Sequence, residues 1–164
     1  MERESNWARC GACGWRLFQN VAAAAAVLLF DDAGRLLWVR RGLDPGRGLL
    51  GLPGGFVDEG ESAEAAAVRE LREEAGITLD PAALTLLTTL PNRYVFDGMH
   101  YPTLDLYYTA ALPIDQTACT PHTPEVDAVE WHPPQALARE DLAFSAGWSA
   151  VQIWSALSRQ SPQR

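Results

Sequence analysis

Three glutamates, Glu70, Glu73 and Glu74, lie close together in a segment with the pattern of a helix. A helix advances about 100° per residue, so their side chains fall within an arc of roughly 100°. Like charges this close destabilise a helix by about 0.2–0.5 kcal/mol per pair unless cations neutralise them. Carboxylate oxygens suit Mg²⁺ or Mn²⁺, so the cluster indicates a divalent-metal site. A solvated acidic face is the alternative, and the three acids alone favour it.

The segment that carries these acids has helix signals at both ends. Ser62 is a candidate N-cap with Glu64 in the first turn, and Gly76 suits the positive φ at which many helices end. Arg69 lies one turn before Glu73, where it can pair with that carboxylate and fix its orientation. The sequence therefore predicts a helix between Ser62 and Gly76 with the acids along one side.

The residues around the acids complete a longer signature. The chain has the spacing Gly-x5-Glu-x7-Arg-Glu-U-x-Glu-Glu-x-Gly-U, with U a bulky aliphatic residue, at Gly55, Glu61, Arg69-Glu70-Leu71, Glu73-Glu74 and Gly76-Ile77. On these residues the chain resembles the Nudix hydrolases, and the similarity extends over Val21 to about Leu157. The resemblance implies an α+β fold, an α/β/α sandwich with a mixed β-sheet between helices.

The resemblance also implies what the signature does. It would bind Mg²⁺ or Mn²⁺ against the diphosphate of a nucleoside diphosphate linked to another group, and water would break the diphosphate bond. Glu61 would mainly stabilise the loop. The metal ligands would be Glu70, Glu73, Glu74 and the backbone carbonyl of Gly55.

The general base varies across the family. Glu73 is the first candidate, with Arg69 as the catalytic arginine beside it, and Glu125 on the later loop is the second. Asp127 and Glu130 are weaker candidates. An acid on that loop is more often merely exposed, so the sequence leaves the choice open.

The substrate depends on residues outside the signature, where two hints conflict. Pro91 stands at about the spacing associated with ADP-ribose hydrolysing members, and Tyr94 near that of dinucleoside polyphosphate hydrolases. Pro91 could instead terminate a strand, and Tyr94 could be packing. Candidates for substrate contact are Arg40, Arg41, Arg93, Tyr94 and Phe96, with Tyr101 as a further aromatic residue that could stack on a base.

ADP-ribose-like substrates are favoured among several alternatives. NADH, dinucleoside polyphosphates and oxidised nucleoside triphosphates would need the same chemistry with another pocket. A non-catalytic Nudix domain that senses a nucleotide is the alternative of another class. Sensors of that kind usually lose signature residues or add a DNA-binding domain, and neither is seen in this sequence.

A second motif, Cys10 and Cys13, has the Cys-x-x-Cys spacing of half a zinc ribbon. Residues 1–20 resemble the ribbon that precedes some Nudix domains, truncated to one knuckle, so we expect an N-terminal arm followed by the Nudix domain at 21–164. Zinc needs four ligands, and a vestigial turn is favoured over Zn²⁺ binding. Zinc completed by other His or Cys residues, or shared by two protomers, are the alternatives. Cys119 is expected to be a packing residue.

Composition limits the partners. The 164 residues are 48% hydrophobic and carry a net charge of −8, which suits one folded domain and opposes binding to a nucleic-acid polymer. The longest apolar run, Val21–Phe30, is too short to span a membrane, and we expect a cytoplasmic protein. Six tryptophans leave room for an apolar homodimer interface.

The remaining elements follow from turn residues and apolar runs. The resemblance makes the alanine-rich run Val21–Phe30 a strand, against helix propensity, and an Asp/Gly turn predicts a hairpin with residues 35–40. Further strands are expected at Leu84–Leu90, Leu104–Leu112 and Val126–Trp131, with turns at Pro91-Asn92 and Asp97-Gly98. Residues 137–157 are expected to be mostly helical.

Overall fold

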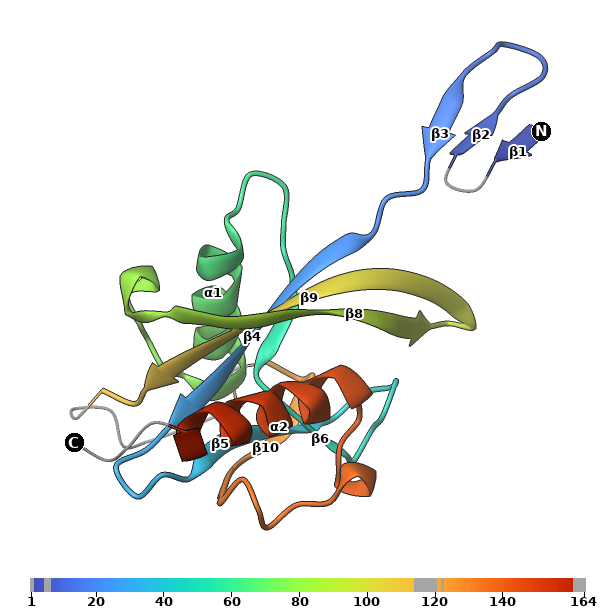
Figure 1. Cartoon of the computed structure of the whole chain (residues 1–164). Helices are drawn as coiled ribbons and strands as arrows, with labels where there is room; N and C mark the ends of the chain where they lie inside the picture. The colour runs from blue at the N-terminus through green and yellow to red at the C-terminus, as the bar shows by residue number, and fades with distance from the viewer. Residues whose placement is uncertain (1, 5–6, 114–120, 122, 161–164) are drawn as a thin grey trace.

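The computed structural model describes residues 2–4, 7–113, 121 and 123–160 (Figure 1). Cys119 lies outside these residues. In chain order the elements are β1 (Glu2–Glu4), β2 (Trp7–Arg9), β3 (Arg16–Phe18), β4 (Ala22–Phe30), β5 (Leu36–Arg41), β6 (Leu50–Gly51), β7 (Gly54–Phe56), α1 (Ala63–Ala75), η1 (Pro81–Ala83), β8 (Thr85–Phe96), β9 (Met99–Ala111), β10 (Val126–His132), η2 (Arg139–Asp141) and α2 (Ser145–Gln160).

A mixed seven-stranded sheet forms the middle layer. Its strand order is β10-β5-β4-β9-β8, with β6 on β5 and β7 on β4, and β4 runs parallel to β9. Alternate side chains of β4 face opposite sides, so Val27 and Leu29 pack against α1 while Leu28 packs in the cluster that includes α2. The predicted α/β/α sandwich is confirmed.

Alanine makes β4 suitable for the centre of this sheet. β7 pairs with β4 so closely that a Cβ on Gly54 would collide with the backbone of Ala25 and Ala26. The amide of Val27 donates to the carbonyl of Pro53 at 2.9 Å. Tertiary pairing on both edges of β4 therefore overrides the helix propensity of its alanines.

The predicted hairpin between the first two long strands forms at its turn but not along its length. The amide of Asp31 donates to the carbonyl of Arg35, and Gly34 has a positive φ of 73°. Beyond this turn only Phe30 and Leu36 are in register. β7 and β9 pair with β4 while β6 and β10 pair with β5, so the two strands splay apart.

The prediction of a turn at Pro91-Asn92 is wrong. β8 continues through both residues to Phe96, and Pro91 pairs with Leu104 of β9. Because β8 is at the end of the strand order, a proline with no amide hydrogen is tolerated there. The turn comes at Asp97 and Gly98, both at positive φ, as a tight two-residue hairpin requires.

The C-terminal helix begins later than expected. α2 starts at Ser145, and residues 137–144 are irregular apart from η2. Leu142 is buried, and the amide of Ala143 donates to the carbonyl of Leu50 at 2.9 Å. These contacts hold the segment against β6 and delay the helix. Among the helices of the described ranges, none has the length and apolarity to cross a membrane.

The N-terminal residues form a separate three-stranded sheet, β1-β2-β3, apart from the main sheet (Figure 1). Cys10 and Cys13 lie in its second turn as free thiols. The amide of Gly14 donates to the carbonyl of Cys10 at 2.9 Å. Hydrogen bonds from the amides of Cys13 and Ala12 lower the pKa of the Cys10 thiol. The knuckle is thus a folded turn, and its expected lack of zinc stays a prediction.

Candidate active site

The helix of the signature has the predicted ends. The Ser62 side chain accepts a hydrogen bond from the amide of Ala65 at 3.1 Å, and Gly76 ends the helix in the left-handed region at φ 69°. The buried side of α1, including Leu71, packs against β4. The acids therefore lie on a helix fixed at both ends, facing the loop that leaves β7.

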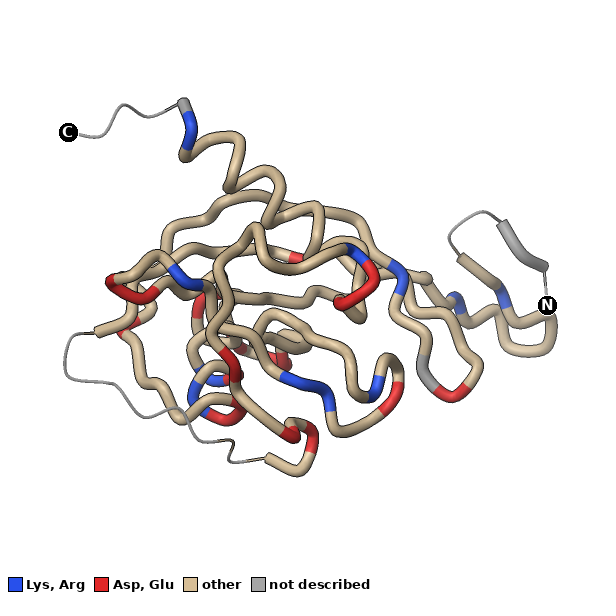
Figure 2. Tube along the Cα trace, turned by 90° about the horizontal axis from the view of Figure 1, so that it is seen from below, with Lys and Arg blue, Asp and Glu red and all other residues tan. Residues whose placement is uncertain are grey.

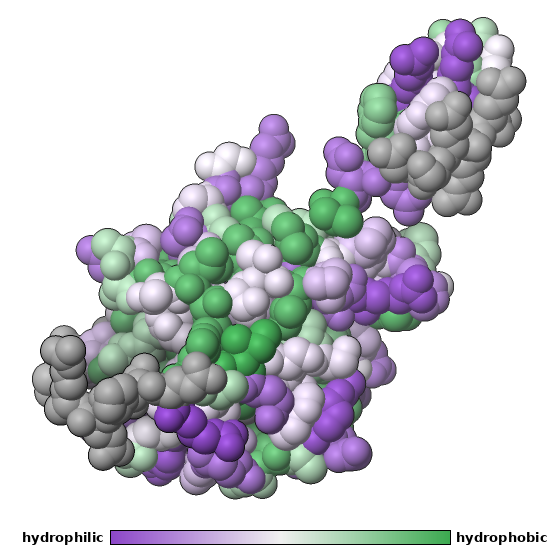
Figure 3. All heavy atoms as spheres, in the orientation of Figure 1, coloured by the Kyte–Doolittle hydropathy of each residue, from purple (hydrophilic) through white to green (hydrophobic). Residues whose placement is uncertain are grey.

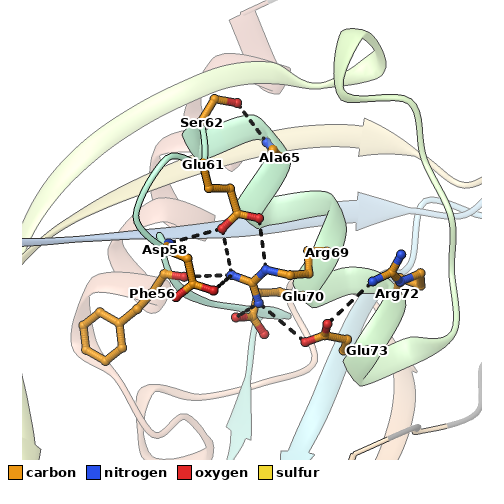
Figure 4. A network of polar contacts seen from close by, with 9 residues as sticks. All are labelled: Phe56, Asp58, Glu61, Ser62, Ala65, Arg69, Glu70, Arg72 and Glu73. Atoms are coloured by element: carbon orange, nitrogen blue, oxygen red, sulfur yellow. Dashed lines mark hydrogen bonds and ion pairs between the residues drawn. The ribbon is translucent and has the colours of Figure 1, made fainter.

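Arg69 joins this loop to the helix (Figure 4). Its guanidinium donates to both carboxylate oxygens of Glu61 at 3.0 Å and to the carbonyl of Phe56 at 3.0 Å. It also donates to Glu70 at 2.7 Å but reaches Glu73 only at 3.5 Å. The hydrogen bonds with Glu61, followed by that with Glu70, raise the pKa of Arg69. Arg69 is thus held mainly by Glu61 and Glu70, and the expected pairing with Glu73 is weaker.

Two glycines bring the backbone against the acids. A Cβ on Gly55 would collide with the carboxylate of Glu70, and the amide of Gly54 donates to Glu74 at 2.8 Å. Burial raises the pKa of Glu70, and it raises that of Glu74 to about 8. Desolvated carboxylates this close together favour a bound cation, because neutralising them removes an unfavourable energy.

The donor set fits a hard divalent cation. Glu70, Glu73, Glu74 and the Gly55 carbonyl would supply only oxygen, which suits Mg²⁺ or Mn²⁺. Within the described residues, no three His, Cys, Asp or Glu side chains are already arranged around one point. Glu73 is turned toward Arg69 and Arg72, and Glu74 accepts from the Gly54 amide. Metal binding would therefore require these side chains to reorient.

The second candidate base lies beside the same helix. Glu125 is exposed, and its backbone carbonyl accepts from the amide of Gly42 at 2.7 Å. Its negative charge contributes to the raised pKa of both Glu70 and Glu74. The loop before β10 thus brings a carboxylate near the acids of α1, and both Glu73 and Glu125 stay candidates.

A cavity opens on the α2 side of the sheet, next to Gly54 and Gly55. Its volume is about 730 Å³, a figure that includes open solvent at its mouth. Its walls are mostly apolar, with polar groups from β8 and β9. Residues that line it include Trp38, Arg41, Phe56, Asn92, Tyr94, Thr103, Asp105, Tyr107 and Phe144.

Residues 20–150 match the NUDIX domain family. This chain belongs to the Nudix family. A Nudix domain of similar structure is that of Shewanella oneidensis NrtR complexed with ADP ribose, with 27% identity, TM-score 0.71, and coverage of 88% of this chain and 91% of that one. A MutT NUDIX hydrolase from Burkholderia pseudomallei has 28% identity and TM-score 0.68, and covers 82% and 98%.

A curated relative is the ADP-ribose pyrophosphatase of Methanocaldococcus jannaschii. It is 35% identical over 79 residues, which are 48% of this chain and 46% of the relative. The Nudix chain thus spans less than half the length of this relative.

Of the predicted substrate residues whose side chains are described, some line the cavity and others do not. Arg41 and Tyr94 line the cavity, whereas Arg40 points away and binds Glu130 and the carbonyl of Gly48. Arg93 is exposed and does not line the cavity, since neighbouring residues of a strand face opposite sides. The side chain of Phe96 lies outside the described residues. The cavity therefore favours Arg41 and Tyr94 as substrate contacts.

Sequence reasoning missed several residues of this cavity. The sequence predicts a turn at Pro91-Asn92 and a helix that includes Phe144, so neither residue is expected in a cavity. Asp105 interrupts an otherwise apolar strand, Leu104 to Tyr107, and that lone acid was the available signal. The role of Asp105 depends on its contact with Asn92 of the neighbouring strand, and the sequence does not show which strands pair.

Proposed function

We propose that this Nudix protein hydrolyses the diphosphate bond of a nucleoside diphosphate linked to another group, with ADP-ribose-like compounds as substrates. The observation that carries the proposal is the position of the complete Nudix signature beside a cavity lined by aromatic and polar side chains. The NrtR domain complexed with ADP ribose and the ADP-ribose pyrophosphatase relative support the choice of substrate.

Nudix hydrolases use divalent metals, and here the ion would be Mg²⁺ or Mn²⁺ held by the carboxylates of Glu70, Glu73 and Glu74 with the Gly55 carbonyl. A bound ion of this kind neutralises phosphate charge and lowers the pKa of water.

The chain's own residues would do the remaining work. Glu73 or Glu125 would take the proton of the attacking water, and the clamp of Arg69 on Glu61 and Glu70 would keep the loop and helix in position. Tyr94 would stack on a planar ring in the cavity, and Arg41 would contact phosphate.

Hydrolysis with identified products tests the proposal. ADP-ribose, NADH, diadenosine polyphosphates and 8-oxo-dGTP would be incubated with Mg²⁺, with the Glu73→Gln variant as the blank. AMP and ribose 5-phosphate released from ADP-ribose by the wild-type chain alone would support it. Inactivity on every compound together with tight ADP-ribose binding would favour a nucleotide sensor.

A homodimer and the absence of a nucleic-acid partner belong to the same proposal. The trace of α2 carries a charge only near its C-terminal end, and apolar side chains gather on the face where α2 lies (Figures 2 and 3). Leu157 of α2 is about half exposed. Light scattering of the purified chain measures its oligomeric state.

A further inference from the structure

The cavity wall holds a buried acid with only neutral partners. Asp105 is 8% exposed, and its carboxylate accepts hydrogen bonds from Thr103 Oγ1 at 2.6 Å, Asn92 Nδ2 at 2.8 Å and Tyr107 OH at 3.2 Å. No Lys, Arg or His side chain in the described ranges forms an ion pair with it. A carboxylate has about four acceptor positions, so one stays free. Burying a charge without a counterion is unfavourable, and a donor from a ligand would offset that cost.

Two unused donors share the same wall. The Nε1 of Trp38 is buried without a hydrogen-bond partner in the part of the chain that the structure describes, and Trp38 lines the cavity. The Asn92 amide donates one hydrogen to Asp105, and its oxygen accepts from the amide of Arg93 at 2.8 Å. Its second hydrogen has no acceptor among the described residues. Because buried polar groups normally find partners, these groups point to a polar ligand.

Aromatic rings at the cavity indicate the shape of that ligand. Tyr94 lies between Phe56 and Phe144, with ring centroids 5.4 and 5.8 Å away. The guanidinium of Arg41 lies over the Phe144 ring at 5.0 Å. Aromatic faces suit a flat heteroaromatic ring. Gly54 and Gly55 also line the cavity, which therefore lies next to the acids of the signature.

We propose that Asp105 is a specificity-determining residue that accepts a hydrogen bond from the amino group of the nucleobase. Adenine presents an amino donor beside a ring-nitrogen acceptor, which matches the free position on Asp105 and the second amide hydrogen of Asn92 beside it. The inference rests on the proposed function, because the nucleobase belongs to the nucleotide whose diphosphate would be cleaved at the signature acids. A site built for this hydrogen bond rejects an analogue that lacks the amino group, because Asp105 is then left under-satisfied.

Binding of two nucleoside monophosphates tests this, because neither contains a diphosphate bond that could be cleaved. AMP and purine riboside 5′-monophosphate, which lacks only the amino group, are titrated calorimetrically against the wild-type chain with Mg²⁺. We expect AMP to bind at least about tenfold more tightly, the scale of one hydrogen bond to a charged group. In Asp105→Asn the preference is expected to fall below about threefold, since a donor replaces one acceptor. Asp97→Asn, the same change in the β8–β9 turn, should keep the full preference.

Each result decides the matter. Equal affinity of the two ligands for the wild-type chain would overturn the inference, and this comparison holds even where Asp105→Asn fails to fold. An unchanged preference in a folded Asp105→Asn variant would also overturn it. If neither ligand binds while ADP-ribose is hydrolysed, the proposed function stands and the role of Asp105 is wrong. If AMP is preferred through Asp105 but ADP-ribose is not hydrolysed, the inference stands and the proposed substrate is wrong.

Discussion

The acids of α1 and the single acid of the cavity are held in different ways. Glu70 and Glu73 compete for one guanidinium, that of Arg69, which is held most strongly by Glu61. Asp105, in contrast, accepts from three neutral donors and forms no ion pair with any described residue. A crowded set of acids short of positive charge suits a metal ion, whereas one buried acid with neutral hydrogen-bond partners suits a neutral N–H donor. Under the proposed function, the α1 side of the sheet would carry the chemistry and the cavity on the α2 side would recognise the nucleotide.

The largest expected effect is on the chemical side. Glu73→Gln removes a carboxylate that the proposed function uses as metal ligand or as base, and it should lower turnover by at least about 100-fold. The fold should persist, because Glu73 is only partly buried. Steady-state rates of ADP-ribose hydrolysis measure this, with Glu59→Gln, an exposed acid of the neighbouring loop, as the matched control. Near-normal turnover of the Glu73 variant would mean that Glu73 is neither metal ligand nor base, and Glu125 would then be the remaining candidate base.

The clamp between loop and helix should come next. Arg69→Ala breaks the hydrogen bonds to Glu61, Glu70 and Phe56, so the acids lose their position relative to Gly55. We expect kcat to fall by about 10- to 100-fold and thermal unfolding to occur at a lower temperature. Arg72→Ala is the control, since the Arg72 side chain is exposed and among the described residues pairs with Glu73 alone, at 3.6 Å. Similar losses in both variants would show that general charge, rather than the clamp, is what matters.

These two helix positions could be predicted from the sequence because their partners are local. The Ser62 cap, the Gly76 end and the spacing of the acids are all readable within fifteen residues of chain. The cavity is different, since Asn92 and Asp105 meet only through the register of β8 and β9. Pairing between strands is decided by tertiary packing, so neither their contact nor the strand through Pro91 could be predicted.

On the recognition side we expect a change in binding rather than in chemistry. Tyr94→Ala removes an aromatic face of the cavity, and KM for ADP-ribose should rise about tenfold with little change in kcat. Tyr101→Ala, an exposed position of β9 outside the cavity lining, should have no effect. A fall in kcat with constant KM would contradict the view that the cavity serves binding while the acids of α1 serve the chemical step.

The smallest effect concerns an acid of a third kind, paired with a cation. A hydrogen bond from Arg40 lowers the pKa of Glu130 below its ordinary value of 4.5. A lowered folded-state pKa means that the ionised carboxylate stabilises the fold above pH 4.5 and that this contribution disappears as the pH falls through the folded-state pKa. Because the pair is partly exposed, Glu130→Gln should reduce the free energy of unfolding at pH 7 by at most about 1 kcal/mol.

The difference between Glu130→Gln and the wild-type chain should therefore shrink as the pH is lowered from 7 toward 4. Urea unfolding at several pH values measures it. Turnover should stay near the wild-type value, because Arg40 points away from the cavity next to Gly54. A stability difference that did not depend on pH would mean that Glu130 acts through packing. A large loss of turnover would mean that the Arg40–Glu130 pair, like the acids of α1, takes part in hydrolysis.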